Sequence, residues 1–482
     1  MAVLEMVRGQ GERHPGAVAV AWDGEAVTYG ELMRQASATA ASLRAAGAGE
    51  GTAVAVRMPA GARRIAALLG VFEAGAHLLW LGPQTAGDRT RQVLADLRPG
   101  CLVTDGPPAR DGLTRWYCDE LGGHVLDGAA EELTAGPGNV PPARAEHWAY
   151  VAYTSGSSGT PKAIPQTHGA LAQFVTWMAR EFGIGPGSRV AQWVTPEHDP
   201  ALCETFAALV AGATLCPVPD AVRVHPERLA GWLARERITH LQTVPGFARE
   251  LLAAFDRERP TALSHLLLMG EALPDRLANE LRATLPGTRL FNLYGPTETI
   301  AATWYEITTP MSGTVPIGRP IPGREVSVLD EADHPCPPGV TGEIVIRSPY
   351  VTPLLPELYR TGDLGLRRAD GLLEFRGRKD FQIKLYGHRL ELTDIEAALA
   401  GHDSVEECAV RVLTGRDGLV DRLVVYVVPR RAADGEPVAT AQAWRAHLRG
   451  RFGTLVLPAT FETLDGRLPR NAAGKVDRSR LR

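Results

Sequence analysis

Residues 153–162 read YTSGSSGTPK and carry the strongest local signal in the sequence. They follow an apolar run, residues 148–153, that predicts a β-strand. Hydroxyls and backbone N–H groups donate hydrogen bonds and Lys162 supplies charge, so the loop is suited to phosphate oxygens. The loop does not have the P-loop spacing, because Thr160 and Pro161 separate Gly159 from the lysine. A flexible surface loop is the alternative, and the lysine at its end favours phosphate binding.

The scarcity of lysine gives that residue weight. Lys and Arg together number 51, but the lysines are only Lys162, Lys379, Lys384 and Lys475. A compact ammonium on a flexible stem is not equivalent to the guanidinium fork of arginine, so a retained lysine is a candidate for a specific role. Chance survival in an arginine-rich background is the alternative. The sequence contexts favour a role for three of them, whereas we expect Lys379 to face solvent.

Composition excludes several classes of protein. The 482 residues are 45% hydrophobic and 22% charged, with a formal net charge of −4, which is typical of a globular protein and argues against a general nucleic-acid binder. No apolar run reaches the roughly 18 residues of a membrane span, and the N-terminus lacks a signal-peptide pattern. The six cysteines are scattered with no CxxC pair, so we expect neither a disulfide framework nor a zinc site, and a cytoplasmic location.

The order of expected elements predicts an α/β fold in two units. Apolar spacing predicts helices from residue 28 to about 46 and over 62–73, and a strand over 53–58. Strand and helix patterns alternate again from about 189 to 300, whereas residues 106–147 are expected to form a surface excursion. Short antiparallel strands are expected over 310–356. A second, α+β unit begins near Asp380, with helices at 393–400 and 440–449 and strands at 405–413 and 423–428. The predicted domains are therefore residues 1–379 and 380–482.

The 153–162 loop resembles the phosphate loop of adenylate-forming enzymes, specifically the amino-acid-activating adenylation domains of nonribosomal peptide synthetases. Further motifs match the family in order: NLYGPTET at 292–299, YRTGDL at 359–364, GRKDFQIKLYGHRLE at 377–391 and LPRNAAGKVDR at 468–478. The resemblance covers essentially the whole chain. It implies a large N-terminal adenylate-forming domain of layered sheets and helices, followed by a small mobile C-terminal domain.

The resemblance implies a site for ATP and Mg²⁺. Tyr294 is similar to the residue that stacks on adenine, Glu298 to the Mg²⁺ ligand, and Asp363 to the carboxylate that binds the ribose hydroxyls. These side chains suit such roles: an aromatic face, a hard oxygen ligand and an ionised acceptor. Alone, Asp363 would be interpreted as a turn residue after Gly362. The other expected nucleotide-binding residues are Thr154, Ser155, Gly156, Ser157, Ser158, Gly159, Thr160, Lys162, Gly270, Glu271, Ala272, Asn292, Gly295, Thr297 and Arg378.

The resemblance also implies a reaction in two steps. A substrate carboxylate attacks the α-phosphate of ATP, pyrophosphate leaves, and a phosphopantetheine thiol then attacks the aminoacyl-AMP. Lys475 is similar to the catalytic lysine that contacts both the substrate carboxylate and the α-phosphate, where a point cation stabilises developing charge. A solvated lysine near the chain end is the alternative. Asp380 resembles the hinge of the mobile domain, and Lys384 and Gly387 resemble residues that face the site in the thioester-forming orientation.

Asp199 falls where amino-acid activators place the carboxylate that pairs with the substrate ammonium. The alternative is a turn aspartate before Pro200. His198 stands where such activators usually have Phe, and some acyl-CoA ligases have an aromatic residue or His there. By the same resemblance, the mostly apolar side-chain pocket indicates a medium to large, mainly apolar amino acid. Its expected lining is Pro200, Cys203, Gln242, Leu267, Met269, Leu293, Ala301 and Ala302.

The expected partners are an amino acid and a phosphopantetheinylated carrier protein acting in trans, because no carrier domain follows in the sequence. A small MbtH-like activator protein is a further partner that the resemblance allows. Neither a nucleic acid nor a membrane is expected to be a partner. Two other functions remain open: an acyl- or aryl-CoA ligase that uses the same adenylation step, and a nucleotide-binding module without catalysis. Retention of Lys475 and Glu298 argues against the second.

Overall fold

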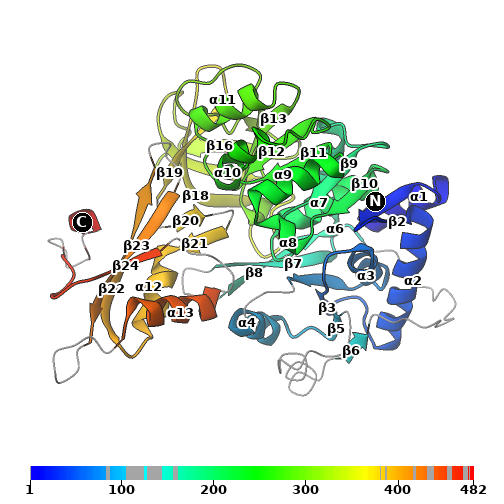
Figure 1. Cartoon of the computed structure of the whole chain (residues 1–482), viewed down its shortest axis with the longest axis horizontal. Coiled ribbons are helices and arrows are strands. Elements are labelled where there is room, and N and C mark those ends of the chain that lie inside the picture. The colour runs from blue at the N-terminus through cyan, green and yellow to red at the C-terminus, as the bar shows by residue number, and fades with distance from the viewer. Residues whose placement is uncertain are drawn as a thin grey trace.

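The computed structural model describes residues 2–82, 87–104, 124–127, 144–155, 161–379, 382–385, 388–415, 420–430, 439–452, 459–470, 476 and 478–481. Figure 1 shows a large N-terminal body of helices and sheets and a smaller C-terminal unit at one end of it. Among the described helices, none is both long and apolar enough to span a membrane. The α/β fold class and its two unequal parts are confirmed.

A six-stranded sheet forms one layer of the N-terminal body, in the order β6-β5-β3-β4-β7-β8. All its neighbours are parallel except β7 and β8, which form an antiparallel pair on either side of the predicted phosphate loop. The strands are β3 (Ala53–Arg57), β4 (His77–Leu81), β5 (Cys101–Thr104), β6 (His124–Asp127), β7 (Trp148–Ser155) and β8 (Pro161–Thr167); α3 (Ala62–Glu73) and α4 (Gly87–Leu97) connect them. The predicted excursion at 106–147 was wrong in part, because β6 lies within it.

A nine-stranded sheet forms the second layer, in the order β15-β14-β13-β12-β11-β9-β10-β1-β2. Its centre is parallel, as the alternation of strands and helices predicts. The strands are β1 (Val18–Trp22), β2 (Glu25–Thr28), β9 (Arg189–Gln192), β10 (Thr214–Pro217), β11 (His240–Thr243), β12 (His265–Met269), β13 (Arg289–Tyr294), β14 (Thr303–Glu306) and β15 (Arg319–Pro320). The helices are α1 (Val3–Arg13), α2 (Tyr29–Ala45), α6 (His168–Glu181), α7 (Asp199–Val210), α8 (Asp220–Arg223), α9 (Pro226–Arg235), α10 (Pro245–Phe255), α11 (Asp275–Thr284) and the 3₁₀ turn η1 (Thr297–Thr299).

Helices α2, α3, α6 and α7 share one apolar core with strands of both layers. The predicted helix that opens near residue 28 is confirmed as α2. Thr28 caps it, since its hydroxyl accepts the N–H of Glu31 at 3.3 Å while the Glu31 carboxylate accepts the N–H of Thr28 at 2.9 Å. The hydroxyl of Tyr29 donates to the carbonyl of Ala213 at 2.8 Å, which ties α2 to the start of β10.

A four-stranded antiparallel sheet follows in the order β16-β17-β18-β19; its first two strands lie in the region 310–356, where short antiparallel strands are expected, and its last two lie beyond that region. It carries the YRTGDL motif on its third strand. Its strands are β16 (Glu325–Leu329), β17 (Gly342–Arg347), β18 (Leu358–Arg367) and β19 (Leu373–Arg378). Tyr294 from the end of β13 belongs to the same apolar cluster as Val326 and Ile344, so this sheet packs beside the end of the nine-stranded one.

The C-terminal unit has its own core, in which Trp444 is fully buried and donates from its indole N–H to Ser404 Oγ at 2.9 Å. Strands β22 and β23 are antiparallel, and β24 joins β23 in parallel. Its elements are β20 (Gln382–Leu385), β21 (His388–Glu391), α12 (Leu392–Ala400), β22 (Val405–Thr414), β23 (Val420–Pro429), α13 (Ala441–Phe452), β24 (Ala459–Thr463) and the 3₁₀ turn η2 (Arg478–Arg480). The two expected helices and two expected strands of this unit are confirmed.

Candidate active site

The predicted adenine and ribose residues meet between two sheets. The hydroxyl of Tyr294, at the end of β13, donates to Asp363 Oδ2 at 2.6 Å, and both side chains are buried. Arg378 lies opposite Asp363 on the next strand and forms an ion pair with Asp363 Oδ1. A carboxylate offers about four acceptor positions, so each oxygen retains capacity for a ligand hydroxyl. Asp363 lies within β18, so the interpretation as a turn residue is wrong.

Burial and the neighbouring Asp363 carboxylate raise the pKa of Tyr294 well above its usual value. The phenol therefore remains a hydrogen-bond donor throughout the neutral range. The strand around Asp363 is fixed as well, since its N–H donates to Thr361 Oγ1 at 3.0 Å and that hydroxyl donates to the carbonyl of Ile344 at 2.7 Å. The geometry presents a fixed acceptor beside an aromatic ring.

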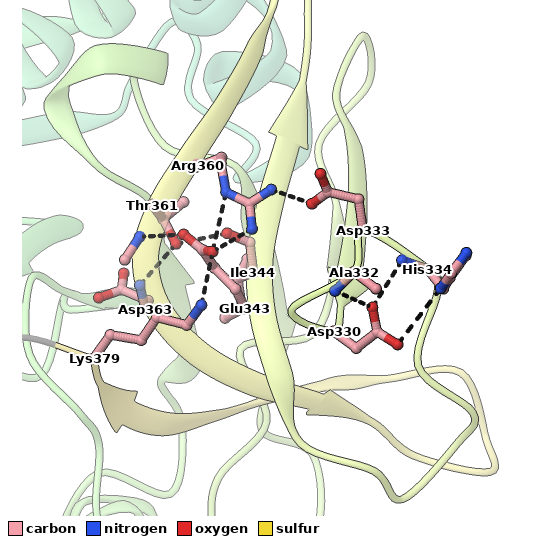
Figure 2. Close-up of polar contacts among 11 residues, drawn as sticks. Asp330, Ala332, Asp333, His334, Glu343, Ile344, Arg360, Thr361, Asp363 and Lys379 are labelled. Carbon is pink, nitrogen blue, oxygen red and sulfur yellow. Dashed lines mark hydrogen bonds and ion pairs between the residues drawn. The ribbon is translucent and has the colours of Figure 1, made fainter.

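Glu343 on β17 contacts both β18, the strand that carries Asp363, and Lys379, the last residue before the predicted hinge, as Figure 2 shows. Its carboxylate accepts from Arg360 Nη2 at 2.7 Å, from the N–H of Gly362 at 3.1 Å and from Lys379 Nζ at 3.1 Å. Burial alone would raise the pKa of Glu343, but the bonds from Lys379, Arg360 and the Gly362 N–H outweigh burial and lower it. Lys379 is exposed, as expected, but its ammonium also forms an ion pair with the buried carboxylate of Glu343.

The predicted metal ligand lies on a short turn that is fixed from two sides. Glu298 is 2% exposed, and its carbonyl accepts from the N–H of Thr352 at 2.8 Å and from Gln166 Nε2 at 3.0 Å. Gln166 Nε2 also donates to the carbonyl of Thr297 at 3.1 Å. Since Gln166 lies on β8, which begins at Pro161, the strand that leaves the phosphate loop also braces this turn.

The predicted ammonium-binding residue is joined to the same turn. Asp199 is buried in the first turn of α7, and its Oδ1 accepts from Thr297 Oγ1 at 3.1 Å. A helix N-terminus stabilises a carboxylate through its unpaired N–H groups. Asp199 is therefore a helical residue rather than part of an isolated turn, and a single threonine separates it from Glu298. His198 precedes it as the N-cap residue.

The predicted pocket residues on the nine-stranded sheet share one face. Gln242 pairs with Leu267, and Met269 pairs with Leu293, on three adjacent parallel strands. Leu267 and Leu293 belong to the same core cluster as Cys203 on α7 and Ala301, so the helix covers that face. Burial raises the pKa of Cys203 well above its usual value, which keeps the thiol neutral. Pro200 is the second residue of α7, and Ala302 is fully buried after η1.

Three of the expected nucleotide residues have structural contacts of their own. Glu271 Oε2 accepts the N–H of Gly246 at 2.7 Å, and Asn292 Nδ2 donates to the carbonyl of Pro316 at 2.8 Å. Gly295 is pressed against the following turn: a Cβ there would overlap the Cα of Ala301 and the N of Ala302. Gly270, between β12 and Glu271, has a φ of 100°, which favours glycine. Ala272 follows in the same connection.

Several predicted residues lie partly or wholly outside the described structure. Thr154 and exposed Lys162 pair across β7 and β8, and of Ser155 only the backbone is described. Lys384 lies on β20, opposite Arg389 on β21, without a described side chain. The residues outside the described part are Gly156, Ser157, Ser158, Gly159, Thr160, Asp380, Gly387 and Lys475.

The sequence patterns missed three residues of this region: Gln166, Tyr150 and Arg324. Gln166 braces the Glu298 turn. Tyr150 is fully buried with no hydrogen-bond partner for its hydroxyl in the described chain, and burial together with the charge of Asp199 raises its pKa well above the usual value. Arg324 donates to carbonyls of the turn after Glu298. None lies in a charged or glycine-rich motif, so no local signal marked them.

The comparisons place this chain in a family. The model of the AMP-binding enzyme family matches residues 7–354, and the model of the AMP-binding enzyme C-terminal domain matches residues 394–475. The chain therefore belongs to the AMP-binding enzyme family, and the resemblance to adenylation domains of nonribosomal peptide synthetases is confirmed. As a member of that family it belongs to the adenylate-forming class, and it spans less than half the length of the first curated relatives that it matches.

The relatives include synthetases and a carrier-protein ligase. The L-proline–[L-prolyl-carrier protein] ligase of Streptomyces coelicolor is 33% identical over 100% of this chain and 96% of its own length. The phosphinothricin tripeptide synthetase PhsB of Streptomyces viridochromogenes is 35% identical over 99% of this chain, which spans only 41% of that protein. The structure of the amide bond synthetase McbA from Marinactinospora thermotolerans has a TM-score of 0.86 at 25% identity, covering 100% of this chain and 99% of that one.

Proposed function

We propose that this protein activates an α-amino acid with ATP and transfers the aminoacyl group to the phosphopantetheine thiol of a carrier protein. The observation that carries the amino-acid part is the contact between Thr297 Oγ1 and Asp199 Oδ1, at 3.1 Å. It places a buried carboxylate next to the residue that precedes Glu298. A buried carboxylate attracts a substrate ammonium strongly and discriminates against acids without an amine.

In the proposed first step, an oxygen of the substrate carboxylate attacks the α-phosphorus of ATP. The bond from that phosphorus to the bridging oxygen breaks, and pyrophosphate leaves with the electron pair. Tyr294 and Asp363 orient the adenosine, the 154–162 loop binds the departing phosphates, and Lys475 stabilises the charge at the α-phosphate. These assignments extend the family's pattern to matching residues.

The residues around Glu298 fit Mg²⁺. No cluster of three or more His, Cys, Asp or Glu side chains in the described chain could enclose a metal ion by itself. Mg²⁺ bound with ATP needs few protein ligands, because phosphates and water supply most of its coordination. One buried carboxylate on a braced turn suits that requirement, and Mg²⁺ there would neutralise charge on the phosphates. Glu298 is the residue that would hold it.

In the proposed second step, a thiolate attacks the acyl carbon and AMP leaves. We propose that residues 380–482 rotate about Asp380 between the two steps and bring Lys384 and Gly387 to the site in place of Lys475. The thiol acceptor is supported by the L-prolyl-carrier protein ligase, which aligns along nearly its whole length. A coenzyme A acceptor is the alternative. The apolar face around Leu267 and Leu293 supports a medium to large, mainly apolar amino acid as substrate.

Amino-acid-dependent ATP–pyrophosphate exchange over a panel of amino acids tests the first step. We expect exchange with one or a few mainly apolar amino acids and none with their deaminated analogues. Asp199→Asn keeps an acceptor for Thr297 but removes the charge, so the amino-acid KM should rise by about 100-fold, as for a buried charge left unpaired. The control is Asp256→Asn at the exposed C-cap of α10, which should behave as wild type. If deaminated acids supported ATP–pyrophosphate exchange, and Asp199→Asn did not change that exchange, an acyl- or aryl-CoA ligase would be favoured.

The acceptor is tested separately. Purified adenylate is offered a phosphopantetheinylated carrier protein, coenzyme A or a free amine, and the acylated product is identified by mass spectrometry. Transfer to the carrier alone supports the proposal, whereas transfer to coenzyme A or to an amine refutes its second step. Nucleotide binding without adenylate formation for any acid would indicate a non-catalytic module.

A further inference from the structure

The turn after Glu298 has an unusual backbone. Ile300 and Ala301 are consecutive non-glycine residues in the left-handed region, with φ of 46° and 60°. L-residues there cost of the order of 1–2 kcal/mol each, and β-branched residues are especially disfavoured. The turn persists only if surrounding contacts fix it. It connects the predicted metal ligand Glu298 to the pocket residue Ala302, and it contains the pocket residue Ala301.

Arg324 supplies those contacts. Its Nε donates to the carbonyl of Ala301 at 2.9 Å, and its Nη2 donates to the carbonyls of Thr299 at 3.2 Å and Ile300 at 3.4 Å. Its Nη1 donates to Gln173 Oε1 at 2.6 Å and to the carbonyl of Pro322 at 3.2 Å. These contacts engage all five N–H groups of the guanidinium. Three of its acceptors are successive carbonyls of the strained turn.

The guanidinium is enclosed rather than solvated. Arg324 is 5% exposed, and its Cζ lies 5.8 Å from the ring centre of Phe174 and 5.4 Å from that of Tyr350. Burial lowers its pKa to about 10, so it remains charged at neutral pH. Its hydrogen-bond acceptors are carbonyl and amide oxygens. A buried charge that donates to neutral carbonyls adds little to the free energy of unfolding, because the cost of removing the charge from water offsets its hydrogen bonds. These contacts therefore point to a role in fixing the turn.

The same turn is held at its other end by Gln166 and by the N–H of Thr352, which reach the carbonyl of Glu298. Its last residue, Ala302, donates its N–H to the carbonyl of Tyr294 at 2.7 Å. Glu298 and Ala302 are thus anchored, and Arg324 holds the carbonyls of the three residues between them. The guanidinium of arginine spreads its N–H donors over three nitrogens and so spans three successive carbonyls, whereas the three N–H groups of lysine radiate from a single atom.

We propose that Arg324 is a positioning residue of the active site: it holds Thr299, Ile300 and Ala301 in the left-handed turn that sets Glu298 towards the metal and Ala301 towards the amino-acid side chain. The roles of the metal and the amino acid in this proposal rest on the proposed function. The hydrogen bonds from Arg324 to the carbonyls of Thr299, Ile300 and Ala301, which we call the clamp, are a property of the ligand-free chain. Arg324 acts through the turn and contacts neither ligand.

Hydrogen exchange of the ligand-free protein tests the clamp. Arg324→Met removes the donors with little loss of volume, and Arg324→Lys retains the charge without the fork. In both variants we expect the amides of residues 298–302 to exchange at least tenfold faster, since charged hydrogen bonds to that backbone are lost. Arg276→Met, which removes an exposed arginine of α11, is the matched control. Unchanged exchange in a folded Arg324→Met, or full protection restored by lysine, would overturn the proposal.

A second measurement separates positioning from general stability. Ala301→Gly removes the left-handed strain at the cost of one methyl group, so Arg324→Met should accelerate exchange less in the Ala301→Gly background than in wild type. Equal acceleration of hydrogen exchange in both backgrounds would contradict the clamp.

ATP–pyrophosphate exchange gives a third measurement. In that assay, Arg324→Met should raise the Mg²⁺ concentration needed for half-maximal activity and the amino-acid KM about tenfold, while AMP affinity stays unchanged. A proportionate loss of all activity without a change in KM would indicate a purely structural role. If wild type forms no adenylate with any acid, the proposed function fails, but hydrogen exchange still decides the clamp.

Discussion

The hydroxyl of Tyr294 and the carboxylate of Asp363 are joined by a buried 2.6 Å hydrogen bond, although the residues lie on different sheets. The bond links the end of the parallel sheet to the antiparallel sheet that follows it. It fixes the orientation of the predicted ribose-binding carboxylate and of the aromatic ring beside it. The two residues therefore form one unit of the proposed nucleotide site.

Tyr294→Phe tests this unit, because it removes the hydroxyl and keeps the ring. The ATP KM should rise by about fivefold to tenfold, since Asp363 loses one of its orienting donors but retains Arg378. The amino-acid KM should change little. Steady-state pyrophosphate exchange with each substrate varied separately measures both. An unchanged ATP KM would mean that Arg378 alone orients Asp363.

Glu343→Gln should lower the free energy of unfolding at pH 7 by about 1–3 kcal/mol, because it weakens the bonds from Arg360, Lys379 and the N–H of Gly362. The pKa of Glu343 is lower in the folded protein than its usual value of 4.5. Its contribution is therefore fully present above pH 4.5 and is lost as the pH falls through the lower, folded pKa. The difference between the two proteins should vanish in acid, as measured by urea unfolding at several pH values.

The control for that experiment is Glu325→Gln. Its carboxylate pairs with Arg347 at 3.9 Å and is 72% exposed, so its loss should have little effect at any pH. If wild type and Glu343→Gln had the same free energy of unfolding at pH 7, the Glu343 contacts would not stabilise the protein as predicted.

Gly295→Ala should severely destabilise the protein, since the new methyl group would overlap backbone atoms of Ala301 and Ala302 that cannot move independently. We expect a loss of about 3 kcal/mol or more, or a failure to fold. Gly287→Ala is the matched control, because its Cβ would meet nothing within 4 Å. Thermal unfolding compares the two variants. Similar melting temperatures would show that the turn after Glu298 adapts easily.

Gln166→Leu should raise the Mg²⁺ concentration needed for half-maximal activity several-fold, because it removes the donors to the carbonyls of Thr297 and Glu298 and keeps similar volume. AMP affinity measured without metal should remain unchanged, which provides an internal control. A loss of AMP affinity equal to the loss of Mg²⁺ affinity would show that the brace acts on the whole site.

The sequence could predict elements whose signals are local. Helix α2 has a capping residue and regular apolar spacing, and β7 has a continuous apolar run before the loop. Tyr294, Glu298 and Asp363 lie in short motifs, so resemblance could assign them expected roles. The structure brings Tyr294 and Asp363 into contact and connects Asp199 to Thr297.

The contacts that brace the site could not be predicted in this way. Gln166 reaches Glu298 across 132 residues, and Arg324 reaches Gln173 across 151. The exposure of Lys379 could be predicted, but its ion pair with Glu343 could not, because Glu343 lies 36 residues away on β17. Such pairs depend on how the sheets pack, and a single sequence contains no periodic or motif signal for that.

A carboxylate shared by two neighbours couples them thermodynamically. Glu343 accepts from the N–H of Gly362, which precedes Asp363, and from Lys379, which precedes residue 380. We therefore expect the proposed binding of a nucleotide at Asp363 to be coupled, through Glu343, to the contact with Lys379 at the start of the C-terminal unit. Because linkage is reciprocal, a change in that contact should alter nucleotide affinity by the same factor.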